Sequence, residues 1–85
     1  MINNTFSNRD FLQIFDLIST KGVKSEGSYE FLGIKALHDF DGYTCWITYK
    51  DLTITLLFHG KFSVEYKHED TFNEFNNKMN TLIGK

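Results

Sequence analysis

Three consecutive runs of alternating side chains in the middle of the chain constrain its fold more than any other feature. Residues 43–49, 52–58 and 62–66 each alternate between the two faces that a half-buried strand presents. Two residues separate the first two runs, and a His-Gly pair lies between the second and third. Such short connections join antiparallel neighbours, whereas a parallel crossover needs about a dozen residues or more. The pattern therefore predicts an antiparallel meander.

Helical spacing flanks this meander on both sides. Residues 8–20 are predicted to form a helix, with Ser7 as its N-cap, Phe6 packed against Phe11, and Gly22 as its C-terminal stop. A second helix is expected after residue 69 and should end near residue 84. The apolar residues that recur at helical spacing are Phe11, Ile14, Phe15 and Ile18 in the first helix and Phe72, Phe75, Met79, Leu82 and Ile83 in the second.

Between the first helix and the meander, the sequence predicts a loop over residues 21–28. Two short strands follow at residues 29–31 and 34–37, and residues 39–42 form a turn. The predicted architecture is a single α+β domain over residues 1–85. It is an antiparallel sheet of four to five strands with the N- and C-terminal helices packed on one face.

Charge and cysteine content exclude several classes of protein. Nine Lys and Arg residues against eleven Asp and Glu residues give a net charge of −2, which argues against direct binding of nucleic acid. No apolar run approaches the length of about 18 residues needed to span a membrane. The lone Cys45 cannot form an internal disulfide, and its strand position predicts a small core residue. These features favour a cytoplasmic protein.

Aromatic residues are unusually frequent, at 16% of the chain. Ten of the fourteen rings have predicted core positions in the helix stripes or on one sheet face, and Tyr29, Phe31 and Phe40 are ambiguous. The remaining ring, Trp46, is predicted to point away from the helices. The ten predicted core rings are Phe6, Phe11, Phe15, Phe58, Phe62, Phe72, Phe75, Tyr43, Tyr49 and Tyr66.

The second face of the predicted sheet has the composition of a contact surface. Charges are sparse on it, and Trp46 is flanked by Thr and Leu side chains. The residues that we predict to bind a protein are Trp46, Leu57, Thr48, Thr55 and Leu37. Two alternatives stay open: self-association as a homodimer through this face, or exposed strands whose Thr residues reflect only high β-propensity.

Histidines and carboxylates supply the alternative candidate for chemistry. A metal- or ligand-sensing site would use His38, Asp39, Asp41 and His59, if the fold brings them together. Turn formation explains the same residues, so the primary prediction is no metal and no cofactor. The sequence shows neither a nucleophile elbow nor a phosphate-binding glycine loop, and the chain is predicted not to be an enzyme.

Several short segments carry a resemblance to a known family. They are Tyr29-Glu30, Gly33-Ile34-Lys35-Ala36, Asp39-Phe40-Asp41-Gly42-Tyr43, Phe58-His59-Gly60-Lys61 and Tyr66. Over residues 11–75, the chain resembles a domain-of-unknown-function family of small gammaproteobacterial proteins. The resemblance implies a bacterial setting and assigns no catalytic residue. The small size, the aromatic excess and the missing catalytic motifs lead us to expect a non-enzymatic interaction module. It would act as an inhibitor or adaptor of a larger bacterial protein or nucleoprotein complex, for example as a phage or mobile-element blocker of host defence.

Overall fold

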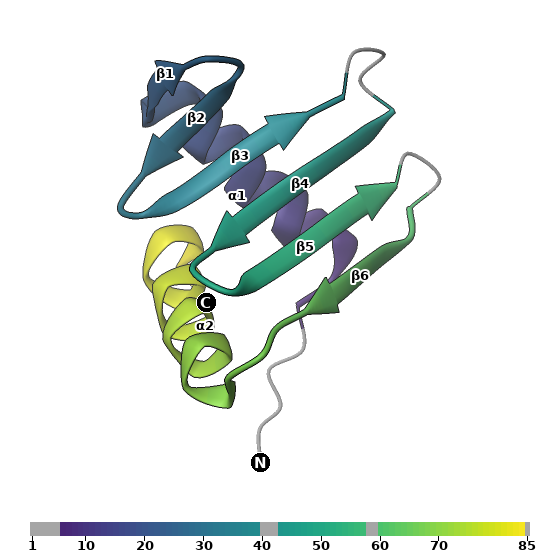
Figure 1. Cartoon of the computed structure of the whole chain (residues 1–85), viewed down its shortest axis with the longest axis vertical. Coiled ribbons are helices and arrows are strands. Elements are labelled where there is room, and N and C mark those ends of the chain that lie inside the picture. The colour runs from purple at the N-terminus through teal and green to yellow at the C-terminus, as the bar shows by residue number, and fades with distance from the viewer. Residues whose placement is uncertain (1–5, 40–42, 58–59, 85) are drawn as a thin grey trace.

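The alternating runs form neighbouring strands of one sheet in a computed structural model, which describes residues 6–39, 43–57 and 60–84 (Figure 1). Within these residues, six antiparallel strands follow one another in sequence order, with one helix before them and one after. The α+β class and the meander are therefore confirmed. The elements are α1 (Asn8–Lys21), β1 (Val23–Ser25), β2 (Ser28–Phe31), β3 (Ile34–His38), β4 (Thr44–Tyr49), β5 (Leu52–Leu57), β6 (Phe62–Glu65) and α2 (Glu69–Ile83).

The prediction of four to five strands is wrong, because part of the predicted loop over residues 21–28 is a strand. β1 pairs with β2, so that Val23 lies opposite Glu30. Glu26 and Gly27 form the turn between them at φ of 48° and 85°. Two successive residues at positive φ suit a tight hairpin. All three β1 residues are exposed, so the segment lacks the apolar alternation that reveals a half-buried strand.

Helix α1 begins as the sequence predicts. The Ser7 hydroxyl accepts a hydrogen bond from the Asp10 backbone N–H, and the Asp10 carboxylate accepts one from the Ser7 N–H at 2.9 Å. This reciprocal capping box satisfies two backbone donors at the helix end. The rings of Phe6 and Phe11 lie 6.1 Å apart, which confirms the predicted contact across the cap.

Gly22 ends α1, but not through the left-handed conformation that commonly makes glycine a helix stop. Its φ is −82°, and its N–H donates to the Ile18 carbonyl oxygen at 2.7 Å. A Cβ at this position would lie 2.5 Å from that oxygen and 2.7 Å from the Glu30 carbonyl oxygen. Glycine is required here because the chain passes very close to β2.

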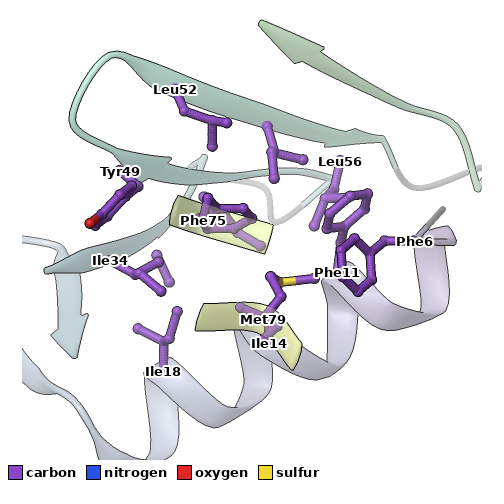
Figure 2. Close-up of a cluster of buried hydrophobic side chains, with 13 residues drawn as sticks. Phe6, Phe11, Ile14, Ile18, Ile34, Tyr49, Leu52, Leu56, Phe75 and Met79 are labelled. Atoms are coloured by element: carbon purple, nitrogen blue, oxygen red, sulfur yellow. The ribbon is translucent and has the colours of Figure 1, made fainter. Parts of the chain in front are cut away.

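Both helices pack on one face of the sheet. In Figure 1, α1 crosses behind the strands and α2 lies next to the end of the sheet where β4 turns into β5. The buried cluster between the layers contains side chains from both helices and from the strands (Figure 2). Its fully buried members include Ile14, Ile18, Ile34, Ile47, Leu52, Ile54, Phe75 and Met79. The predicted arrangement, with both helices on one face, is confirmed.

Asp51 ties the β4–β5 turn to the beginning of α2. Its carboxylate accepts hydrogen bonds from the backbone N–H groups of Lys67 and His68 at 2.6 and 2.9 Å, and from the Thr71 hydroxyl at 2.6 Å. The N-cap residue His68 makes no capping hydrogen bond with its own side chain. Asp51 therefore supplies, from a distant turn, the acceptor that an N-cap side chain normally provides.

Candidate functional site: the open sheet face

The sheet face opposite the helices is covered by no described element. We call it the open face, and in Figure 1 it is turned toward the viewer. Successive side chains of a strand point to opposite faces of the sheet. In β3, β4 and β5, every second side chain points into the core, and the side chains between them lie on the open face. The open face comprises Leu37, Thr44, Trp46, Thr48, Thr53, Thr55 and Leu57.

Strand register places Trp46 in the middle of this face. Leu37 lies directly opposite Trp46 on β3, and Thr55 lies directly opposite it on β5. Cross-strand neighbours are about 4.5–5.5 Å apart at Cβ, so these three side chains form one contiguous row. Ser28 and Ser63 continue the row toward the two sheet edges. No residue of the row carries a formal charge.

The remaining predicted binding residues adjoin this row. Thr48 lies opposite Thr53, and Leu57 lies opposite Thr44. Leu57 is 37% exposed, and Trp46, Thr48 and Thr55 are partly exposed. All five residues predicted from the sequence are therefore on one uncovered face, although this placement does not test their role.

The charged strand residues on this side of the sheet, Glu30, Lys35 and Glu65, lie in a parallel row at one margin. Glu30 lies opposite Lys35, and Lys35 lies opposite Thr48. Glu65 lies opposite Thr53 at the far end of the same row. An uncharged row with a tryptophan at its centre and charges at its border matches the composition of protein interfaces, in which charges are depleted in the core.

The histidine and carboxylate cluster is only partly within the described residues. One ring nitrogen of His38, Nδ1, lies 2.9 Å from the Asp39 carbonyl oxygen. The Asp39 carboxylate accepts a hydrogen bond from the Thr44 N–H at 3.4 Å, so it helps to close the β3–β4 connection. Asp41 and His59 lie outside the described residues. The part of the chain that is described contains no group of three potential metal ligands.

Cys45 points to the opposite side of β4 from Trp46 and packs against the buried cluster, as predicted. Burial raises the pKa of its thiol above the ordinary value of 9.0, and the nearby Asp39 carboxylate raises the pKa further. The thiolate, which is the reactive form, is therefore disfavoured at neutral pH.

A groove on the helix side of β6 was not foreseen from the sequence. Aromatic rings line a cavity of about 280 Å³ between β6 and the two helices. Phe62 and Tyr66 were predicted to be core residues, yet they are 39% and 41% exposed. Tyr43, also predicted to be in the core, is 61% exposed next to a turn, and Phe58 lies outside the described residues. Strand parity placed Phe62 and Tyr66 on the correct face, but the helices leave that edge of the sheet partly uncovered.

A family model described as Protein of unknown function (DUF3081) matches residues 6–85. The chain belongs to this family. The predicted membership of a domain-of-unknown-function family is thus confirmed, and the match extends beyond residues 11–75 at both ends. No curated protein and no solved structure matches the chain. Within its described residues, no helix is long and apolar enough to cross a membrane.

Proposed function

We propose that this protein is an interaction module that binds a partner protein through the open face. The observation that carries the proposal is the position of Trp46 at the centre of an uncharged row on a sheet face that no described element covers. Tryptophan is enriched among the residues that dominate binding energy, especially near the centre of an interface. Leu37 and Leu57 add apolar area around it, and the Thr side chains add hydroxyl groups.

A rigid sheet is well suited to this role. The backbone of β4 is held on both sides, by β3 and by β5, so Trp46 is presented in a fixed position. Binding then costs little conformational ordering of the backbone. We propose that the protein acts as an inhibitor or adaptor by occupying a surface of a larger bacterial protein or nucleoprotein complex. The contact in this proposal is made with protein rather than with nucleic acid, in keeping with the net charge of −2.

The test compares Trp46→Glu with a matched control, Leu12→Glu. Leu12 is an exposed apolar residue of α1, 45% exposed, and it lies away from the open face. Tagged wild type and both variants are used to purify partners from cells, and each candidate partner is then purified and titrated against the three proteins. We expect Trp46→Glu to weaken binding by about tenfold or more, because a central aromatic anchor is replaced by a charge. Leu12→Glu should bind like the wild type.

The single tryptophan also provides a direct signal. Trp46 is the only tryptophan of the chain, so fluorescence reports on the open face alone. Emission should shift to shorter wavelength when a partner that lacks tryptophan covers the ring. A partner that binds wild type and Trp46→Glu equally well, with no change in emission, would contradict the proposed site.

A further inference from the structure

The outer edge of β6 is the starting point for a further inference, which does not depend on the role of the open face. Among the strands of the described residues, β6 is the last of the sheet and pairs only with β5. In Figure 1, no described element lies beyond its outer edge. An unpaired strand edge presents backbone donors and acceptors that can pair with another strand.

The backbone groups that face outward can be assigned. The Leu57 N–H donates to the Lys61 carbonyl oxygen at 2.8 Å, so the backbone of Lys61 faces β5. Hydrogen bonding alternates along an antiparallel strand. The N–H and C=O groups of Phe62 and Val64 therefore point away from β5, toward the free edge.

We propose that the occupant of this edge is a second copy of the same chain, paired antiparallel through β6 with Ser63 on the two-fold axis. In this register Phe62 lies opposite Val64 of the second copy, and the reverse pair is equivalent. Both residues of each pair have outward backbone groups, so each pair exchanges both of its N–H···O bonds. In a register shifted by one residue, backbone groups that point away from β5 would lie opposite residues of the second copy whose backbone groups point toward their own β5. The hydrogen bonds between the two copies would then be lost.

Charge favours this register over neighbouring ones that the backbone allows. With Ser63 on the axis, Lys61 lies opposite Glu65 of the second copy, and symmetry produces this opposite-charge pair twice. These are non-hydrogen-bonded pairs, in which the side chains approach most closely. Moving the axis to Val64 would place Lys61 opposite Lys67, and moving it to Glu65 would place two Glu65 side chains opposite each other. Directly opposed like charges destabilise a strand pair.

The exposed aromatic residues of this edge fit the same register. Phe62 is 39% exposed, and the second copy would lay Val64 beside it. Tyr66, 41% exposed and stacked on Phe72 with ring centroids 4.7 Å apart, would lie opposite Gly60 of the second copy. Among the described residues, a Cβ at Gly60 would have no neighbour within 4 Å, so this position is open on the side of its missing side chain. An aromatic ring opposite a glycine is a known means of stabilising a strand edge.

The proposed dimer has a consequence for the whole surface. A two-fold axis perpendicular to the sheet keeps all the helices on one side, and it joins the two open faces into one continuous surface. Because β6 contributes only four residues, the interface is small, and the dimer should dissociate on dilution.

The experiment is a charge-swap cycle on the full chain, read by sedimentation equilibrium over a range of concentrations. Lys61→Glu places like charges opposite each other twice, and so does Glu65→Lys. We expect each single variant to raise the dimer dissociation constant by about tenfold or more, because two cross-strand pairs change from attraction to repulsion. The double variant Lys61→Glu/Glu65→Lys restores opposite charges and should return the constant to near the wild-type value.

Lys21→Glu and Asp16→Lys are matched controls, because they make the same changes of charge at exposed positions on α1. They should leave the dissociation constant unchanged, and thermal melts of every variant exclude unfolding as the cause of dissociation. A wild type that is monomeric up to its solubility limit overturns the proposal. So does a double variant that dissociates as readily as the single variants, or a dimer that is abolished by Trp46→Glu but not by either charge reversal.

Discussion

At the scale of single residues, the carboxylate of Asp51 stabilises the beginning of α2 in place of an N-cap side chain. The pKa of this carboxyl lies well below its ordinary value of 3.8. The hydrogen bond from the Thr71 hydroxyl is the main cause, followed by the backbone N–H groups of His68 and Lys67. All of these donors favour the ionised form. Folding and ionisation of Asp51 are therefore coupled.

We expect Asp51→Asn to lower the free energy of unfolding at neutral pH and to weaken its dependence on acid. A carboxyl whose pKa is lowered by folding stabilises the folded state above its unfolded-state pKa, and this stabilisation is lost as the pH falls toward the folded-state pKa. Urea titrations of the wild type should therefore show decreasing stability from about pH 5 downward, with a shallower decrease for the variant. His68 Nδ1 also lies 3.7 Å from the Asp51 carboxylate.

Asp16→Asn is the control for this measurement, since Asp16 is an exposed carboxylate on α1. It should keep the wild-type pH profile. Parallel profiles for the wild type and Asp51→Asn would contradict the assignment of acid sensitivity to the α2 cap.

At the scale of the elements, the junction between α1 and β1 depends on the absence of a side chain at Gly22. We expect Gly22→Ala to destabilise the protein by about 1–3 kcal/mol, as is typical when atoms are forced into a packed site. The added Cβ would meet two backbone carbonyl oxygens at 2.5 and 2.7 Å, and backbone atoms cannot rotate away. Chemical denaturation of both proteins measures the difference.

Gly27→Ala is the matched control for Gly22→Ala. Gly27 has a φ of 85°, but no atom of the described part of the chain lies within 4 Å of an added Cβ, so its replacement should cost only the backbone strain of about 1 kcal/mol. An equal or larger loss for Gly27→Ala would contradict the expectation that close approach to backbone atoms makes Gly22 the more sensitive position.

The elements also show what the sequence could and could not predict. The spacing of apolar residues and the capping residues predicted both helices and the meander. These signals were sufficient because they depend only on residues close together in the sequence. β1 was missed because its three exposed residues show no apolar period, and its pairing depends on a turn in which Glu26 adopts positive φ. The meander of the other five strands does not depend on β1, so the predicted fold class was still correct.

Long-range contacts were the other limit on prediction. The role of Asp51 could not be read from the sequence, because its partners are 16 to 20 residues away. The open face was predictable, because strand parity alone separates Trp46 from Cys45 and Ile47. The groove beside β6 was not, since strand parity does not show how far the helices extend across a sheet.

At the scale of the whole molecule, the described residues form two layers, and none of these residues covers the second face of the sheet. The helices protect the cluster around Ile47 and Ile54, while Trp46 and its row face outward. A second copy could reduce this exposure only by stacking on the open face. Edge pairing through β6 instead leaves the face available to a partner, so the two modes of dimerisation differ in what happens to Trp46.

Tryptophan quenching by acrylamide distinguishes these modes. We expect the quenching constant of Trp46 in the wild type to stay the same across the concentration range in which dimers form, because edge pairing does not cover the ring. The matched variant Trp46→Phe/Tyr66→Trp moves the single tryptophan to the β6 edge, where quenching should decrease as dimers form. If dimer formation reduced the quenching of a tryptophan at position 46 but not of a tryptophan at position 66, the dimer would form by face-to-face stacking. That result would contradict edge pairing. The expected result leaves the open face free in the dimer, where a partner could contact both Trp46 side chains at once.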